Sequence, residues 1–280
     1  MVRAEIRRLK TLEEFRACER LQLEVWGSLA VGAELLGVTQ KYGGAVLGVL
    51  ARGRVVGFLY AFLARRHGRL IHWSHMMAVD EGHRDLGLGF RMKLAHRQYA
   101  LAQGLKSICW TYDPLQSRNA ALNLTRLGAR VVEFIPNCYG RFPSAIERGL
   151  TSDRFVVDWR IGSRAVARRL REKPPRLSDA ARWPQVNETQ RNAQGLLVNA
   201  RLHLNLRAPR LLVEIPPNTD AMRASALALA RRWRLESRRI FQGYLAAGYR
   251  VDDFLPPSAA TDGRCFYLLR KGAGDSQVGD

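Results

Sequence analysis

Residues 45–112 restrict the fold more than any other part of the chain. Three β-rich runs there are separated only by RGR and RHGR, which is typical of an antiparallel meander. The third run ends at Val79 and passes through the turn RDLGLG into a helix-like run that reaches Gly104, and KSICWTYD then follows as a strand. Because a helical crossover joins parallel strands, we expect KSICWTYD to lie parallel to the strand that ends at Val79. The predicted sheet is therefore mixed and mostly antiparallel.

The helix-like run after the turn carries both apolar and basic residues. Phe90, Leu94 and Leu101 share one face at helical spacing, so this face is predicted to be the buried one. Lys93 and His96 are then expected to point away from it.

Strands and helices also flank this central stretch. RAEIRRL alternates like a first strand, and TLEEFRACERLQLEVWG follows as a helix. Thr11 can cap this helix, Glu14 three residues on completes a capping box, and Gly27 stops it. SRNAALNLTRLG is a short helix closed by Gly128, and ARVVEFIP and DRFVVDWRI are strands. The fold class is α/β (α+β), with a twisted, mostly antiparallel sheet flanked by helices.

Changes in composition and patterning along the chain predict four segments. Residues 1–161 form the main domain, and 162–195 are a basic helix followed by a Pro-containing polar linker. Residues 196–271 form a smaller α/β extension with one long helix, capped by Thr219 or Asp220, and 272–280 are a frayed tail. RNAALNLTRLGARVVEF and RRIFQGYLAAGYRVDDF echo each other weakly, which leaves open that the extension is a degenerate half of the main domain.

The charge of the chain is its unusual property. The formal net charge is +20, from 45 basic and 25 acidic residues, and only six of the basic residues are lysine. This arginine excess fits nucleic-acid binding, because arginine grips phosphates. It fits equally a genome that favours arginine codons, since the arginines are spread along the chain.

The cysteines and the chain start point to a cytoplasmic protein. The four cysteines are far apart and form no CxxC pair, which is typical of reduced thiols. The first residues, MVRAEIRRLK, have no apolar signal-peptide core. No apolar run approaches the roughly 18 residues of a membrane span, so no membrane partner is expected.

The turn RDLGLG is of the kind that holds phosphates at a helix start. It is not a P-loop, because GxxxxGK[ST] does not occur, and it lacks the third glycine of the dinucleotide fingerprint, since Met92 stands there. What remains is R-x-x-G-x-G, formed by Arg84, Gly87 and Gly89. Glycines let a backbone approach a ligand closely, and N–H groups at a helix start attract anions.

This motif, in its place among the elements of residues 3–161, resembles the GNAT superfamily of acyl-CoA-dependent N-acyltransferases. The closer resemblance is to a branch of predicted enzymes with a stretch like WTYDPLQSRNAALNLTRLGA and a C-terminal extension. It implies a GNAT-like fold in which the strand before the turn splays from the next strand and acyl-CoA lies in the gap. The expected cofactor-binding residues are Met77, Ala78, Val79, Arg84, Asp85, Leu86, Gly87, Leu88, Gly89, Ser117 and Asn119.

The resemblance carries over only part of the expected catalytic side chains. Many family members use a Tyr as proton donor to the departing thiolate, but Leu124 occupies that position here. Tyr139 is a candidate substitute, and His75 is a candidate base. His72 and His75 are expected on opposite sides of one strand, so no metal pair is predicted. Acids near the predicted cleft offer further bases through water, namely Asp80, Glu81 and Asp113.

The resemblance implies an N-acyltransferase with acetyl-CoA or succinyl-CoA as cosubstrate and no metal. The acceptor is expected to be a small amine, with an amino acid favoured because arginines can hold its carboxylate. The alternative is an RNA- or ribosome-associated protein, for which RIGSRAVARRLREK and RRWRLESRR are the best evidence, with only Trp233 to stack on bases. The sequence leaves the oligomeric state open, with a homodimer as one option. The C-terminal unit is expected to shape the acceptor pocket and to bind no CoA of its own.

Overall fold

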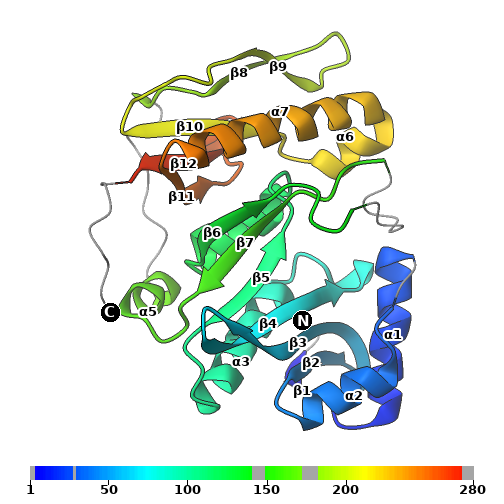
Figure 1. The fold of residues 1–280 in the computed structure, drawn as a ribbon. Helices are drawn as coiled ribbons and strands as arrows, with labels where there is room; N and C mark the ends of the chain where they lie inside the picture. The colour runs from blue at the N-terminus through cyan, green and yellow to red at the C-terminus, as the bar shows by residue number, and fades with distance from the viewer. Residues whose placement is uncertain (1–3, 28–29, 141–148, 172–181, 273–280) are drawn as a thin grey trace. The chain divides into compact units, whose positions relative to one another are not determined.

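The computed structural model describes residues 4–27, 30–140, 149–171 and 182–272, and Figure 1 shows its ribbon. The chain forms two compact units. Of the described residues, unit 1 comprises 4–27, 30–111 and 158–168, and unit 2 comprises 112–140, 149–157, 169–171 and 182–272. The division passes through the chain at Tyr112, and again within one strand and one helix. It does not follow the boundaries at 161 and 195, which stay a prediction.

The sheet of unit 1 has the strand order β1-β2-β3-β4-β5. Its strands are β1 (Glu5–Arg8), β2 (Ala45–Ala51), β3 (Arg54–Arg66), β4 (Arg69–Val79) and β5 (Ile108–Tyr112). The first four are antiparallel to their neighbours, and β5 is parallel to β4. The predicted meander and the predicted parallel crossover strand are thus both confirmed.

Helices cover both faces of this sheet. One apolar cluster joins β2 and β3 to α1 (Leu12–Trp26) and α2 (Ala33–Lys41), with Phe15, Leu36 and Phe58 at its centre. A second cluster joins the opposite face to α3 (Leu88–Ala102) through Leu88 and Met92. Unit 1 is therefore a three-layer α/β/α arrangement, as the fold class predicts.

The caps of α1 are those that the sequence predicts. The Thr11 side chain accepts from the Glu14 N–H, the Glu14 side chain accepts from the Thr11 N–H, and Gly27 ends the helix with φ of 77°. Helix α2 was not expected. Its sequence AELLGVTQK is short and contains a glycine and a β-branched residue, so its own helix propensity is weak. Packing of Ala33 and Leu36 against the sheet supports it.

The buried face of α3 is not the one that the apolar spacing predicts. Lys93 and His96 are 3% and 0% exposed, whereas Leu101 is exposed. The expectation that the two basic residues point outward is wrong, because the buried stripe of the helix also carries Leu88 and Met92. A polar group can lie on a buried stripe when other buried groups bind it.

Unit 2 contains the remaining strands and helices. Its three-stranded sheet has the order β10-β12-β11, from β10 (Arg210–Ile215), β11 (Tyr249–Leu255) and β12 (Cys265–Lys271). The same unit holds α4 (Ser117–Ala120), a π-helical turn (Ala121–Arg126) and β6 (Arg130–Ile135), and it takes in all but the last two residues of β7 (Arg154–Trp159). Gly128 closes the π-helical turn with φ of 70°, as expected.

Three predictions for the C-terminal part need correction. Part of the predicted linker is β8 (Asn187–Arg191), which pairs with β9 (Leu197–Leu202) in a hairpin. The predicted single long helix is two helices, α6 (Thr219–Ser225) and α7 (Leu227–Ala246), which meet at the non-helical residue Ala226. Asn218 caps α6, not Thr219 or Asp220. The predicted basic helix is found as α5 (Arg164–Arg171).

Aromatic rings form the core of unit 2. Phe155 of β7 lies 4.8 Å from Phe241 of α7 and 5.6 Å from Tyr267 of β12, measured between ring centroids. Tyr112 is buried beside the same rings and close to the Tyr267 hydroxyl. Residues 112–157 therefore share their core with the C-terminal strands and helices. No helix in the described part of the chain is long and apolar enough to cross a membrane.

Candidate active site

The turn before α3 presents an uncapped helix start. Asp85 and Gly87 both have positive φ, 64° and 70°, and Gly87 is the N-cap residue of α3. Glycine suits such a position because it lacks the Cβ that makes the left-handed region costly. The helix has no side-chain cap and no acidic residue in its first turn. Its first N–H groups therefore favour an anion from outside the helix.

Arg84 strengthens this electrostatic preference. Arg84 is exposed to solvent, and its Nε lies 3.4 Å from the carbonyl oxygen of Val79. Leu88, the first helical residue, is 4% exposed and fixes the helix start to the sheet. The turn is thus anchored on one side and open on the other.

Strands β4 and β5 pair only at their beginnings. The recorded partners are His72 with Ile108 and Trp73 with Cys109. From Ser74 to Val79 the described residues of β4 show no pairing with β5, while Met77, Ala78 and Val79 remain paired with β3. The two strands therefore form a fork that opens toward the turn. Backbone N–H and C=O groups on the β5 side of β4 are left for another partner.

A β-bulge lies at the base of this fork. Tyr60 of β3 pairs with Met76, and the next residue, Ala61, pairs with Ser74. His75 is therefore the extra residue of β4. Bulges bend a strand and re-aim its side chains, and they are frequent beside active sites.

The two catalytic candidates lie in different units. His75 is exposed on β4, with its ring 6.0 Å from that of Tyr60 and 5.9 Å from that of Phe62. The surrounding protein lowers its pKa, so it is neutral and able to accept a proton near neutral pH. Tyr139 of unit 2 is 40% exposed, and the Arg154 guanidinium lies 5.3 Å from its ring centre. Their joint participation in one site stays a prediction.

The cofactor candidates also divide between the units. Residues 77–79 and 84–89 are in unit 1, and Ser117 and Asn119 are in unit 2. The Ser117 hydroxyl donates to the carbonyl oxygen of Pro217 at 2.6 Å, so it already stabilises unit 2. Asn119 is exposed on α4.

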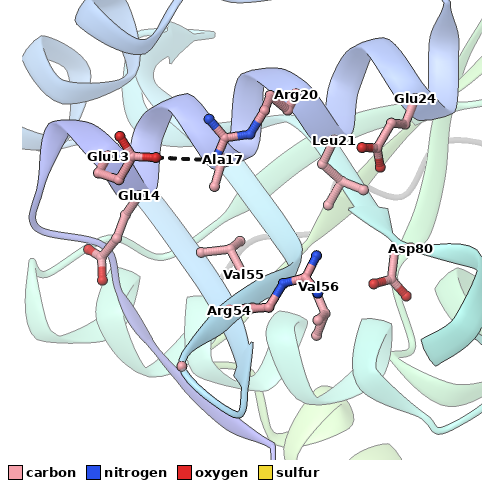
Figure 2. Close-up of a pocket in the computed structure, with 11 residues that line it drawn as sticks. Glu13, Glu14, Ala17, Arg20, Leu21, Glu24, Arg54, Val55, Val56 and Asp80 are labelled. Carbon is pink, nitrogen blue, oxygen red and sulfur yellow. Dashed lines mark hydrogen bonds and ion pairs between the residues drawn. The ribbon is translucent and has the colours of Figure 1, made fainter.

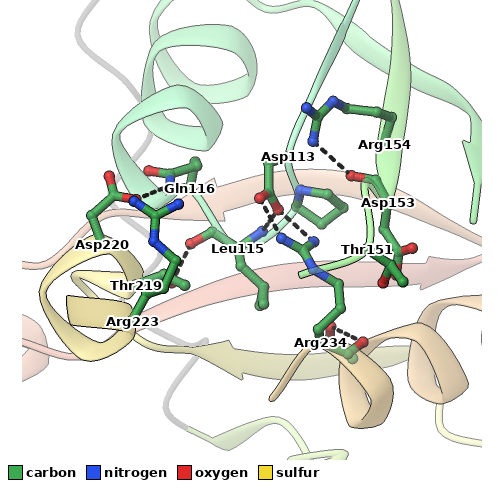
Figure 3. Close-up of polar contacts among 12 residues, drawn as sticks. Asp113, Leu115, Gln116, Thr151, Asp153, Arg154, Thr219, Asp220, Arg223 and Arg234 are labelled. Atoms are coloured by element: carbon green, nitrogen blue, oxygen red, sulfur yellow. Dashed lines mark hydrogen bonds and ion pairs between the residues drawn. The ribbon is translucent and has the colours of Figure 1, made fainter. Parts of the chain in front are cut away.

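Asp113 is a structural carboxylate and not a free base. Both of its oxygens accept from Arg234, one of them at 2.7 Å, and the Leu115 N–H donates to it at 2.8 Å (Figure 3). Despite burial, this ion pair lowers the pKa of Asp113. The same region is tied to α6, where the Thr219 hydroxyl donates to the carbonyl oxygen of Leu115 at 2.7 Å (Figure 3). Asp80 accepts instead from His83 at 2.7 Å.

A buried basic cluster lies under the fork, and sequence reasoning missed it. Lys93 donates to the Ser74 hydroxyl at 3.0 Å, and its Nζ lies 3.5 Å from the centre of the Trp110 ring. Nδ1 of His72 and Nε2 of His96 are 2.9 Å apart, and Nε2 of His72 lies 2.9 Å from the carbonyl oxygen of Gly43. That carbonyl can only accept, so His72 carries its proton on Nε2 and His96 donates to His72.

Burial changes the protonation of this cluster. It lowers the pKa of Lys93 to about 7 and that of His96 well below its usual value, to which the neighbouring Lys93 charge also contributes. Nδ1 of His96 is buried without a hydrogen-bond partner among the described residues. One signal in the sequence points to the cluster. Lys93 and His96 are three residues apart, as helix neighbours are, and Lys93 follows Met92 and precedes Leu94 directly.

A cavity of about 280 Å³ lies between α1, the start of β3 and Asp80 (Figure 2). Its charges are mixed. Glu13 pairs with Arg20 at its edge, and Glu14 is held by Arg7, whose hydrogen bond lowers the pKa of that carboxyl to about 2. Further lining carboxylates and a guanidinium come from Glu24, Asp80 and Arg54. No group of three or more potential metal ligands occurs among the residues that the structure describes.

No family model matches the sequence, and no curated protein does. Solved structures similar to this chain include the NatC complex bound to Gag peptide and CoA, with 12% identity and a TM-score of 0.47 over 56% of this chain and 98% of that one. The ribosomal-protein-S18-alanine N-acetyltransferase from Escherichia coli has 14% identity and a TM-score of 0.47 over 57% and 95%. An acetyltransferase of the GNAT family from Streptococcus pneumoniae has 12% identity and a TM-score of 0.46 over 55% and 97%. The last of these structures is described as a member of the GNAT family.

Proposed function

We propose that the protein is an acyl-CoA-dependent N-acyltransferase that acts on a small amine by direct attack of the amine on the thioester. One observation carries the proposal. The uncapped start of α3, with Gly87 in the left-handed region, stands at the open end of an unpaired fork between β4 and β5. A diphosphate fits the first feature and an extended amide-containing arm fits the second.

The residues present fit acyl-CoA in the expected way. N–H groups at the start of α3 and the Arg84 guanidinium would hold the diphosphate. Backbone groups of Met77, Ala78 and Val79 that face the fork would pair with the amides of the arm. The thioester carbonyl would take a hydrogen bond from the same strand, which stabilises negative charge that develops on its oxygen. His75, at the bulge, is the proposed base, and Tyr139 remains a candidate acid.

The acceptor is proposed to be an amino acid whose amine reaches the thioester end of the arm, beside His75. Arginine side chains can hold its carboxylate. The cavity of Figure 2 is not the proposed acceptor site. Asp80, which lines it, directly precedes the short 3₁₀ turn Glu81–His83 that leads to Arg84, so the cavity adjoins the diphosphate end of the arm. The donor is proposed to be acetyl-CoA or succinyl-CoA.

The nucleic-acid alternative has less support. In RRWRLESRR of α7, Arg234 binds Asp113, Arg238 binds Asp153, and Arg232 binds Glu236. The aromatic residue that could stack on bases, Trp233, is 1% exposed. Most of this basic segment therefore stabilises unit 2.

Calorimetry of CoA binding tests the proposal. Gly87→Glu places bulk and a negative charge at the proposed diphosphate and should weaken CoA binding at least about 100-fold. Gly68→Glu is the matched control, because Gly68 has φ of 76°, also has no atom within 4 Å of a built Cβ, and lies at the opposite end of β4. It should bind CoA like the wild type. Equal CoA affinity of Gly87→Glu and Gly68→Glu would reject the site, and a panel of acyl-CoA donors and amines, followed by thiol release, then identifies the substrates.

A further inference from the structure

A lysine that is fully enclosed in protein needs a reason, because an ammonium group loses most of its hydration on burial. No carboxylate is among the recorded contacts of Lys93. Its Nζ contacts the Ser74 hydroxyl and the Trp110 ring, and His96 follows one turn later on the same helix. These groups stabilise the ammonium only weakly, so the amine exchanges its proton near neutral pH.

The position of this amine is set by the fork. Trp73 and Cys109 are the last paired residues of β4 and β5, and Ser74 and Trp110 are the residues that follow them. Both contact Lys93, so its Nζ lies at the vertex where the strands separate. From Val79 to Ser74 the strand spans about 17 Å at a rise of about 3.3 Å per residue. An extended arm that starts at the α3 turn and follows β4 would therefore bring its sulphur end to this vertex.

We infer that Lys93 is the proton donor to the departing thiolate, in the role left empty by Leu124. The inference rests on the proposed function. As the acceptor nitrogen bonds to the thioester carbon and the C–S bond breaks, the sulphur leaves with the electron pair and takes a proton from the Lys93 ammonium. Lys93 becomes a neutral amine and regains a proton from solvent. The acceptor nitrogen loses its proton to the proposed base His75, which releases it to solvent, so the protons balance.

The neighbouring histidines place no second positive charge beside Lys93, because burial lowers the pKa of both His96 and His72. His96 stays neutral, because both burial and the positive charge of Lys93 lower its pKa. Its Nδ1 is an unused acceptor on the same buried face of α3. His72 is fixed between His96 and the Gly43 carbonyl, so it orients the His96 ring. A pKa of about 7 is well matched to proton transfer at neutral pH.

The test observes the same proton exchange at equilibrium, without an acceptor and without turnover. CoA is titrated with base while bound, and its thiolate is followed by ultraviolet absorbance. On the wild type, the thiol pKa should fall by about 1–2 units relative to that of free CoA, because an opposite charge forms beside it. On Lys93→Met this shift should disappear. Lys106→Met, which removes an exposed lysine of unit 1, and Tyr139→Phe should keep it.

A second arm separates this role from a structural one. CoA that lacks its sulphur should bind the wild type and Lys93→Met with affinities within about twofold, since the diphosphate contacts are untouched. Lys93 is not the donor if the bound thiol titrates alike on the wild type and Lys93→Met, or if the variant loses affinity for the sulphur-free analogue. Failure of the wild type to bind CoA at all would reject the proposed function itself, and this inference with it.

Discussion

Lys93 shows at the residue scale how strongly a single buried charge departs from what a sequence pattern predicts. Apolar spacing placed it on the outer face of α3, yet it is buried with Ser74 and Trp110. The error arises because hydrophobic periodicity treats every lysine as a solvent-facing residue, although a long aliphatic stem can be buried in a core. No acidic residue lies three or four positions from Lys93 along the helix, so the sequence shows no ion-pair partner that would indicate its burial.

The burial of Lys93 has a measurable effect on stability. Its pKa is about 7 in the folded protein and 10.5 without burial. At about 1.4 kcal/mol per pKa unit, the folded state is destabilised by up to about 5 kcal/mol below pH 7. Between about pH 7 and 10.5 the unfolded chain binds more protons, so stability rises with pH in this window.

We predict that Lys93→Met is more stable than the wild type at about pH 6, and that this advantage shrinks as the pH rises toward 10. Methionine retains the stem volume and removes the charge. Urea unfolding at several pH values measures both curves, and Lys106→Met should follow the wild type throughout. A pH-independent difference between Lys93→Met and the wild type would contradict the shifted pKa.

At the scale of elements, some short-range patterns in the sequence predict the structure correctly and others do not. The caps of α1, the meander and the crossover to β5 follow from short-range patterns in the sequence. The break between α6 and α7 and the β8–β9 hairpin were missed. Ala226 has a high helix propensity, so the intrinsic preference of this residue does not explain the break.

Helix α7 is attached to the end of β5 by one ion pair, which gives a prediction at the same scale. Arg234 is 3% exposed at its side chain and binds both oxygens of Asp113. Arg234→Met should destabilise the protein by roughly 3–5 kcal/mol at neutral pH, because it leaves the carboxylate buried and unpaired. Arg232→Met on the same helix removes a half-exposed guanidinium that binds Glu236 and the carbonyl oxygen of Asn199, and it should cost only about 1 kcal/mol.

Two further measurements assign this cost to the charge. Addition of Asp113→Asn to Arg234→Met should restore part of the stability, since the unpaired charge is then absent. The pKa of Asp113 is lowered by Arg234, so the stability from this pair is present above about pH 4 and is lost as the pH falls further. Equal costs for Arg234→Met and Arg232→Met would show that the pair is not structural.

At the scale of the whole molecule, the sequence predicts the fold class, whereas the boundary that it predicts at 161 stays a prediction beside a division into two compact units that passes through the chain at Tyr112. The change in amino-acid composition after Ile161 coincides with a structural element, since the basic helix α5 begins at Arg164. A change in amino-acid composition does not by itself define a compact unit, however, because such a unit is defined by which residues share a core. Phe155, Phe241 and Tyr267 are distant in sequence and neighbours in unit 2, and no local pattern reports such contacts.

We therefore predict that truncation after Ile161 does not leave an intact acyl-CoA-binding domain, which is the opposite of what a boundary at 161 would suggest. The truncated chain keeps residues 112–157 but loses Arg234, Arg238 and Tyr267. Asp113 and Asp153 would then be unpaired, and the Phe155 ring would lose its neighbours. Residues 112–157 should unfold, and the product should be insoluble or should lose the hydrogen-exchange protection of β6 and β7.

A chain that ends at Gly272 keeps all these contacts and serves as the control. A soluble 1–161 fragment with protected β6 and β7 and wild-type CoA affinity would instead show that the C-terminal half is an independent extension.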